Sequence, residues 1–334
     1  MKAIGCIKAK PNEAINPLVD LELPVPKPTG HDLLIEVKAI AVNPIDYKMR
    51  KRIQLEEGYH RILGWDASGV VKEIGDRVIL FKPGDEVWFA GDVTRAGCNS
   101  EFCLIDERIV GLKPKNLSFE QAAALPLTSI TAWEILFDRL TITPNQKGSL
   151  LITGAAGGVG SVLVQLARKL TELTVIGTAG REESQKWIKE HGAHYVIDHN
   201  KPMLEQLEKL GVGQVDYVIS LTHSGEHAVE LVNCLKPQAK FALIDDPENL
   251  DFRIFKLKSL SIHWEMMFTR SMYKTHDMIN QYRILTQVAE LVDKGVIKTT
   301  LNQHFGSINA ANLNKAHELL ISGKSRGKIV LSGF

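Results

Sequence analysis

A glycine-rich turn in the middle of the chain contains the residues with the clearest chemical use. Leu151–Gly160 reads LITGAAGGVG, between a short apolar run and an amphipathic stretch. Because Gly157 has no Cβ, the backbone there can approach a pyrophosphate, and Gly160 in the same way lets a helix pack tightly on a strand. Ala155 stands where the first glycine of the usual G-x-G-x-x-G motif would be. A helix starting here would offer free N–H groups to phosphates. Expected cofactor contacts are Gly154, Ala156, Gly157, Gly158, Val159 and Gly160; the alternative is a purely structural turn.

The residues at the end of the next apolar run, Thr174–Thr178, indicate whether NADH or NADPH is bound. An acidic residue there would bind the ribose 2′-hydroxyl of NAD. The segment Gly177–Arg181 carries no acid, whereas Thr178 and Arg181 suit a 2′-phosphate. Glu182 and Glu183 follow directly, but acids are also favoured at a helix start by the helix dipole. The pattern favours NADPH over NADH.

From residue 148 onward, short apolar strands alternate with helices, and this alternation positions the turn. The predicted strands are Ser149–Thr153, Thr174–Thr178, Tyr195–Ile197, Asp216–Leu221 and Lys240–Asp245, with Leu260–Met266 as a sixth candidate. The predicted helices are Gly160–Leu170, Glu182–His191, Lys201–Leu210 and Glu226–Leu235. Such alternation is typical of an α/β fold with a doubly wound parallel sheet of the Rossmann type.

The first part of the chain is β-rich, with strand-like runs such as Leu33–Ile40 and Gly69–Ile74 and little helical periodicity before residue 118. A capping box, Ser118 with Gln121, predicts a helix start. A long helix is predicted over Asp277–Lys294 and a strand over Lys328–Ser332. We expect two domains, one of residues 1–125 and 268–334 and a Rossmann domain of residues 126–267.

The composition is that of a soluble globular protein. The 334 residues are 44% hydrophobic and 24% charged with a net charge of +1, so no overall field favours nucleic acid or a membrane. The basic run Lys48–Arg52 is expected to be a solvated surface segment. We find no signal peptide or spanning run, and four cysteines do not make a disulfide framework, so a cytoplasmic location is expected.

Several strings along the whole chain resemble one known superfamily. They are Ala41–Tyr47 (AVNPIDY), Leu63–Val71 (LGWDASGVV), Lys82–Val87 (KPGDEV), Ala122–Thr128 (AAALPLT) and Gly327–Leu331 (GKIVL). Together they resemble the medium-chain dehydrogenase/reductases, in the quinone oxidoreductase branch, whose members are often labelled zinc-type alcohol dehydrogenase-like. The resemblance implies a β-rich, GroES-like catalytic domain beside the Rossmann domain.

The resemblance also locates the positions where alcohol dehydrogenases of the superfamily hold a catalytic zinc. Here Asn43 or Pro44 replaces the first Cys, Trp65 replaces the His, Asp66 follows it, and no Cys lies near Thr128. An open zinc site usually needs three protein ligands, so we predict no metal.

The remaining candidate ligands fit a metal poorly. Cys98 and Cys103 are expected to be partly buried thiols, with a metal or redox site as the alternative. His191, His194 and His199 are expected at surface positions.

By the same resemblance, hydride would pass from NADPH to a quinone or to the C=C bond of an α,β-unsaturated carbonyl. Tyr47 is the candidate hydrogen-bond or proton donor. Asn43 and Thr128 would contact the nicotinamide ribose or carboxamide, and Trp65 and Trp264 would wall the substrate pocket. Further expected cofactor contacts are His199, Ile244, Asp245 and, more weakly, Lys328. A homodimer is expected through pairing of Leu260–Met266.

Two other functions stay open from the sequence. One is a zinc-dependent alcohol dehydrogenase, against which the replaced ligands argue. The other is a non-catalytic NADPH-binding redox sensor or lens-type protein, because such a protein would keep the nucleotide turn. Turnover of a simple quinone would separate an enzyme from a binding protein, because the fold itself says little about the substrate.

Overall fold

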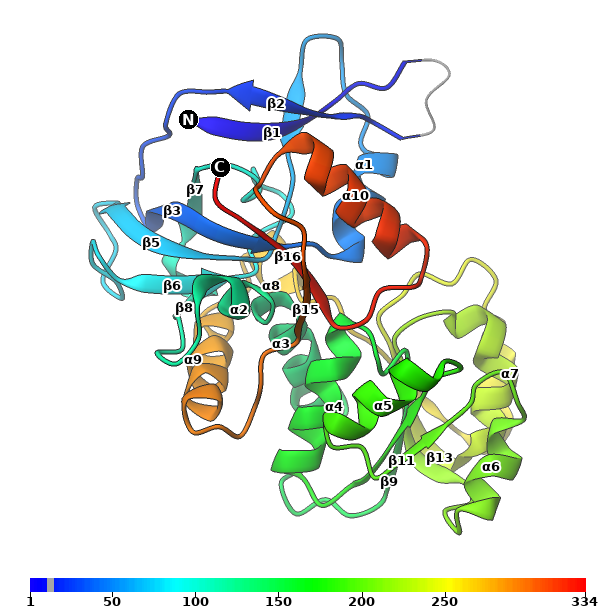
Figure 1. Cartoon of the computed structure of the whole chain (residues 1–334). Helices are drawn as coiled ribbons and strands as arrows, with labels where there is room; N and C mark the ends of the chain where they lie inside the picture. Colours follow the sequence, from blue (N-terminus) through cyan, green and yellow to red (C-terminus); the bar gives the residue numbers. More distant parts are fainter. Residues whose placement is uncertain (11–14) are drawn as a thin grey trace. The chain divides into compact units, whose positions relative to one another are not determined.

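The computed structural model describes residues 1–10 and 15–334, which fold into two compact units. Unit 1 comprises Met1–Ile130 and Phe268–Phe334, and unit 2 comprises Thr131–Met267 (Figure 1). The boundaries thus lie after residues 130 and 267, where the sequence placed them after 125 and 267. In the described part of the chain, no helix is long and apolar enough to cross a membrane.

Unit 2 is built on a six-stranded parallel sheet in the order β11-β10-β9-β12-β13-β14. The strands are β9 (Ser149–Thr153), β10 (Thr174–Thr178), β11 (Tyr195–Ile197), β12 (Val215–Ser220), β13 (Leu235–Leu243) and β14 (Ser261–Trp264). The predicted doubly wound sheet is therefore confirmed. The strand order reverses between β9 and β12, and ligands of such sheets bind beyond the carboxyl ends of the strands at this reversal.

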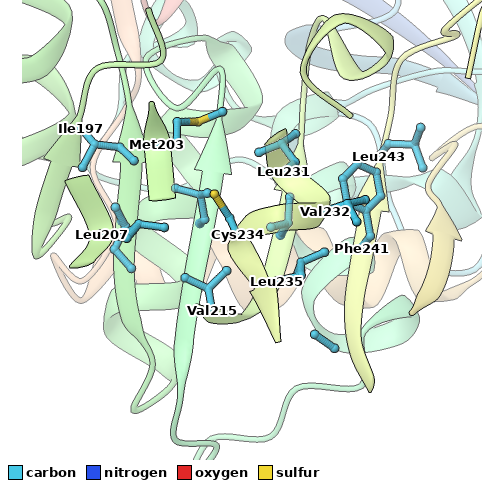
Figure 2. Close-up of a cluster of buried hydrophobic side chains, with 14 of the residues drawn as sticks. Ile197, Met203, Leu207, Val215, Leu231, Val232, Cys234, Leu235, Phe241 and Leu243 are labelled. Atoms are coloured by element: carbon cyan, nitrogen blue, oxygen red, sulfur yellow. The ribbon is translucent and has the colours of Figure 1, made fainter. Parts of the chain in front are cut away.

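Helices cover both faces of this sheet. They are α4 (Gly158–Leu170), α5 (Glu182–Glu190), α6 (Met203–Lys209) and α7 (Ser224–Cys234), with a π-helix at Glu134–Arg139 and a 3₁₀ helix at Phe252–Lys258. Right-handed crossovers place α4 and α5 on one face and α6 and α7 on the other. The indole of Trp187 on α5 donates to Ser161 Oγ on α4 at 2.8 Å. Figure 2 shows the core under α6 and α7, including Met203, Leu207 and Leu231.

Unit 1 contains two sheets. A three-stranded antiparallel sheet consists of β1 (Lys2–Ile7), β2 (Leu18–Glu22) and β4 (His60–Ile62). The larger sheet consists of β3 (Asp32–Ala41), β5 (Ala67–Ile74), β6 (Glu86–Phe89), β7 (Phe102–Asp106), β8 (Val110–Leu112), β15 (Leu301–His304) and β16 (Lys328–Ser332). The central strand β3 pairs with β16, β5 and β7, and this pairing brings residues near position 42 beside residue 328.

The helices of unit 1 are α1 (Pro44–Arg52), α2 (Phe119–Ala123), α8 (Thr269–Met272), α9 (Asn280–Asp293) and α10 (Ala310–Ile321), with a 3₁₀ turn at Glu107–Ile109. Helix α3 (Pro126–Trp133) runs across the boundary between the units. The predicted capping box starts α2, since Ser118 and Gln121 bond reciprocally. The long predicted helix is observed as the shorter α9.

The basic run Lys48–Arg52 is not simply a solvated surface segment, so that expectation was wrong for one residue. The run lies on α1, and the side chain of Arg50 is buried. Arg50 Nε and Nη2 donate to the carbonyl of Asn16 at 3.0 and 2.9 Å, and Nη1 lies 3.0 Å from His317 Nδ1 on α10. A buried guanidinium needs several acceptors, and these acceptors lie far away in the sequence.

Candidate functional site

The glycine turn of unit 2 leaves room for a ligand at the start of α4. Gly154 follows β9 with a φ of +66°, and Gly157 is the N-cap residue of α4, which has no side-chain cap. A Cβ on Gly160 would lie 2.5 Å from Ala155 Cα, which explains why only glycine fits. A Cβ on Gly157 would touch only the Gly154 carbonyl oxygen at 3.3 Å, on a side otherwise open. The first turn of α4 therefore presents backbone N–H groups without a competing side-chain acceptor.

The carboxyl end of β10 carries a polar atom that the protein itself does not satisfy. Thr178 is 2% exposed, and its Oγ1 has no hydrogen-bond partner among the described residues. Such buried hydroxyls normally have a partner, so the atom is suited to a ligand. Arg181 is exposed and is the N-cap residue of α5, with Glu182 and Glu183 in the first turn.

Asp245 is occupied in a hydroxyl network at the same edge of the sheet. Ser224 at the start of α7 donates its backbone N–H to Asp245 Oδ2 at 2.9 Å and its Oγ to the other carboxylate oxygen. Ser224 Oγ is 2.7 Å from Ser220 Oγ, which is 3.2 Å from Thr153 Oγ1. The carboxylate of Asp245 thus fastens α7 to the sheet, and its backbone carbonyl accepts the indole N–H of Trp264 at 3.3 Å. The cofactor contact expected at Ile244 and Asp245 stays a prediction.

Unit 1 holds a closed polar cluster of Asn43, Asp66 and Lys328, all at most 2% exposed. Lys328 Nζ donates to Asp66 Oδ2 at 2.9 Å, to the Val42 carbonyl at 3.0 Å and to Asn43 Oδ1. Asn43 Nδ2 donates to Asp66 Oδ2 at 3.1 Å. The backbone N–H of Leu127 reaches Asp66 Oδ1 at 3.1 Å.

This cluster uses all three donors of the Lys328 ammonium. A phosphate contact by Lys328, which the sequence suggested, would require breaking the ion pair with Asp66. The amide of Asn43 is also fully engaged, so both residues hold the site together. Burial raises the pKa of the Asp66 carboxyl, and the Lys328 ammonium and the Asn43 amide oppose that rise.

A second carboxyl, Asp46 on α1, lies beside this cluster. Its Oδ2 accepts the backbone N–H of Asn43 at 2.8 Å, whereas its Oδ1 has no partner among the described residues. Burial raises the pKa of Asp46 to about 7, and the charge of Asp66 adds to this effect against the influence of Asn43 and Lys328. One proton is therefore held on a buried carboxyl near neutral pH.

This proton should make stability depend on pH. The folded pKa of Asp46 is raised above the unfolded value, so its stabilising effect is present below about pH 4 and is lost as the pH rises through about 7. We expect the free energy of unfolding of the native protein, relative to Asp46→Asn, to fall by about 1 kcal/mol or more between pH 5 and pH 8. Urea unfolding at both pH values measures this, and a pH-independent difference would contradict it.

Tyr47 follows Asp46 on α1 and is half-buried. Burial raises the pKa of its phenol, so the hydroxyl keeps its proton and can donate it. The ammonium of Lys51 lies 5.8 Å from the ring centroid. Thr128 on α3 is buried, and its Oγ1 donates to the Leu125 carbonyl at 3.0 Å.

The two tryptophans expected to wall a pocket have different environments. Trp65 is 1% exposed; its indole N–H donates to the Asp92 carbonyl at 3.0 Å, and its ring packs edge-on against Phe268. This packing places Trp65 in the core of unit 1, and its expected contact with a substrate stays a prediction. Trp264 is 48% exposed on the edge strand β14, where its ring lies 5.8 Å from that of Phe252.

The remaining candidate ligands are dispersed. Cys98 and Cys103 are free and buried, more deeply than expected, and burial raises the pKa of both thiols. His191 bonds the Trp187 carbonyl and His194 accepts the Val175 N–H, whereas His199 lies beside His227. Among the described residues, no group of three or more His, Cys, Asp or Glu side chains converges as a metal site would require.

Sequence reasoning missed Asp46 and the pairing of Asp66 with Lys328. The first had a local signal, because Asn43 and Asp46 have the spacing of an N-cap residue and an acid three positions later. The second had none, because residues 66 and 328 come together only through β3 and its two neighbouring strands.

Comparisons with known proteins agree with this fold. Residues 29–126 match the alcohol dehydrogenase GroES-like domain family, which confirms that expectation, and residues 191–331 match the zinc-binding dehydrogenase family. A zinc-type alcohol dehydrogenase-like protein of Staphylococcus epidermidis is 36% identical over 99% of both chains. The quinone oxidoreductase of Mus musculus is 29% identical over 99% of this chain and 97% of its own.

The solved structures include a similar protein from Rhizobium etli CFN 42, provisionally described as a zinc-dependent alcohol dehydrogenase. It is 51% identical with a TM-score of 0.94, over 100% of this chain and 98% of its own. The likeness therefore extends over the full length in both sequence and fold. The chain belongs to the medium-chain dehydrogenase/reductase superfamily, in its quinone oxidoreductase branch, and is an oxidoreductase of the alcohol dehydrogenase-like family.

Proposed function

We propose that this protein is a cytoplasmic, NADPH-dependent and zinc-independent oxidoreductase that reduces a quinone or an α,β-unsaturated carbonyl. One observation carries the proposal most: at the positions of the superfamily's zinc ligands, Asn43 and the neighbouring Asp66 are engaged with Lys328 in a closed network, and the indole of Trp65 bonds the Asp92 carbonyl. The name of the mouse relative supports a quinone as the acceptor.

The residues of unit 2 fit a nicotinamide dinucleotide. The backbone N–H groups at the start of α4 would hold the pyrophosphate, and Gly157 would allow its close approach. The unsatisfied hydroxyl of Thr178 and the exposed Arg181 would meet the ribose with its 2′-phosphate. The absence of an acid between Gly177 and Arg181 supports NADPH over NADH.

The residues of unit 1 do not fit a catalytic zinc ion. The indole of Trp65 cannot ligate through a lone pair, because its nitrogen carries a hydrogen that binds the Asp92 carbonyl. The carboxylate of Asp66 is already paired with Lys328, and the amide of Asn43 bonds both partners. The description of the Rhizobium etli structure favours a zinc-dependent alcohol dehydrogenase, and the donors present here argue against that alternative.

Without a metal, the protein's own groups must stabilise charge on the acceptor. Bound NADPH supplies the hydride. The phenol of Tyr47 would donate a hydrogen bond from its Oη to the acceptor oxygen, where negative charge develops. The buried cluster beneath α1 would hold Tyr47 in position, since Asn43 and Asp46 fix the first turn of that helix.

Replacing Tyr47 with phenylalanine tests this role. We expect kcat with 1,4-benzoquinone or a simple enone to fall by about 100-fold, because one positioned donor is lost. The dissociation constant for NADPH should change less than twofold, which corresponds to a change of less than about 0.4 kcal/mol in the binding free energy. Tyr273→Phe, at a 74% exposed tyrosine, is the matched control and should keep full activity. An unchanged kcat for Tyr47→Phe would rule out the proposed donor.

The acceptor class is tested by comparing quinones, enones and primary alcohols under steady-state conditions. Oxidation of NADPH by quinones or enones, with no alcohol oxidation, agrees with the proposal. NADPH binding without turnover of any acceptor would instead support the redox-sensor alternative.

The edge strand β14 supports the further proposal of a homodimer. Trp264, Met266 and Phe252 expose between 43% and 50% of their surfaces at this edge, and β14 has one paired neighbour in the sheet. A second copy pairing there would cover both the apolar side chains and the free strand edge. Sedimentation should show a dimer that Trp264→Glu converts to a monomer, whereas Ile79→Glu, at an exposed position of unit 1, leaves it intact. A monomeric native protein would refute the proposal.

A further inference from the structure

Three histidines gather at the carboxyl edge of the sheet in unit 2, next to the expected ribose site. His199 follows β11, and β11 pairs with β10 so that Ile197 lies opposite Thr178. The backbone N–H of Ala179 donates to the Ile197 carbonyl at 2.9 Å, which keeps the two chain segments together beyond the strands. His199 therefore emerges at the same edge as the unsatisfied hydroxyl of Thr178.

The segment that carries His199 packs directly on the segment that leads to Arg181. A Cβ on Gly180 would lie 2.2 Å from the amide nitrogen of Asn200 and 3.4 Å from Asp198 Oδ1. Close packing of this kind leaves His199 and Arg181 on adjoining turns rather than on separate loops.

The start of α7 supplies the other two histidines. The His227 ring centroid is 6.0 Å from that of His199. His223, the N-cap residue of α7, is exposed, and its Nδ1 lies 2.8 Å from Thr222 Oγ1. Ile197, two residues before His199, and Leu231, on the same helix as His227, both belong to the apolar core under α6 and α7 (Figure 2).

The charged groups around His199 are few. The carboxylate of Asp198, on the same loop, raises the pKa of His199. That carboxylate also accepts the backbone N–H of Asn200 at 3.0 Å and pairs with the ammonium of Lys201 at 3.6 Å. His227 and His223, at the start of α7, lower the pKa of His199.

Helix α7, whose N-cap residue is His223 and which carries His227, also carries two acids. Glu226 lies exposed in the first turn of the helix, and the Glu230 carboxylate accepts the backbone N–H of Met203. Burial and then His227 and His223 lower the pKa of His199 against the effect of Asp198, so its imidazole is neutral at neutral pH in the free protein.

We propose that His199 and His227, with His223 at the rim, recognise the 2′-phosphate of NADPH and that the cluster takes up a proton when this phosphate binds. The inference rests on the proposed binding of NADPH. A phosphate monoester carries between one and two negative charges near pH 7, and an anion within about 4–6 Å favours the protonated imidazole. The resulting hydrogen bond between imidazolium and phosphate is stronger than one between neutral groups.

Proton uptake distinguishes this proposal from binding of the phosphate by Arg181 alone, because an arginine side chain is already protonated and takes up no proton. Isothermal titration of NADPH at pH 7, in two buffers with different enthalpies of ionisation, should show uptake of a substantial fraction of one proton. NADH, which lacks the 2′-phosphate, should show almost none. Between pH 8.5 and pH 6.5, the dissociation constant for NADPH should fall about tenfold, whereas that for NADH stays constant.

His199→Gln keeps a polar side chain but cannot titrate. It should abolish the proton uptake and weaken NADPH binding at pH 6.5 about tenfold without affecting NADH. His60→Gln, at an exposed histidine of unit 1, should behave as the native protein does.

The outcomes separate this inference from the proposed function. Preferential NADPH binding without proton uptake would overturn the histidine role and leave the NADPH-dependent function standing. Equal or tighter binding of NADH would overturn the cofactor preference itself, and the inference with it. The measurement on the native protein decides both even if His199→Gln does not fold.

Discussion

Replacing Gly157 with alanine should weaken NADPH binding by about 10- to 100-fold while leaving the stability of the fold nearly unchanged. The added Cβ meets only the Gly154 carbonyl oxygen at 3.3 Å, and the φ of −74° at Gly157 suits alanine. The same methyl group would stand where the pyrophosphate must approach the backbone. Fluorescence titration with NADPH and urea unfolding measure the two effects separately.

Gly160→Ala is the matched comparison, because it adds the same methyl group three residues later. Its Cβ would lie 2.5 Å from both Ala155 Cα and the Gly154 carbonyl oxygen, so the backbone itself must move. We expect a loss of about 1–3 kcal/mol in the free energy of unfolding together with weaker binding. Native NADPH affinity in Gly157→Ala would contradict the assignment of the turn as the pyrophosphate site.

Replacing Lys328 with methionine should destabilise the protein by about 3–5 kcal/mol, because the carboxylate of Asp66 would remain buried without a counter-charge. Both side chains are at most 2% exposed, so solvent cannot replace the missing partner. Loss of the hydrogen bonds to Val42 and Asn43 adds to the effect.

The double variant Asp66→Asn with Lys328→Met should recover a large part of this loss, because the unpaired charge is gone. Urea unfolding of the native protein, both single variants and the double variant forms a complete cycle. If the double variant loses as much free energy of unfolding as the two single variants lose together, Asp66 and Lys328 are not coupled, and the proposed role of their ion pair is wrong.

The sequence predicted unit 2 well and unit 1 less completely, for a physical reason. Strands buried on both faces, such as Ser149–Thr153, have a continuous apolar centre, and helices of 7 to 13 residues separate the first five strands, so the local pattern was sufficient. In unit 1, α1 was missed because its polar residues mask helical periodicity. The burial of Arg50 depends on the Asn16 carbonyl and on His317, neither of which is near in sequence.

The candidate site divides in the same way. The position of the glycine turn between β9 and α4 could be predicted because it depends on residues that are adjacent in sequence, whereas the cofactor contacts of the turn and of Thr178 stay predictions. The engagement of Asn43 and Lys328 with Asp66 could not, because strand pairing across most of the chain creates it. Trp65 is buried against Phe268, and that packing partner, 203 positions away in the sequence, could not be predicted from the local pattern.

One experiment tests the central claim most directly. Purified protein treated with a chelator is analysed for zinc, titrated with NADPH and NADH, and then assayed for NADPH oxidation by 1,4-benzoquinone. We predict no stoichiometric zinc, tighter binding of NADPH than of NADH, and quinone turnover that added zinc does not increase. Stoichiometric zinc that survives purification, and whose removal abolishes alcohol oxidation, would contradict the account.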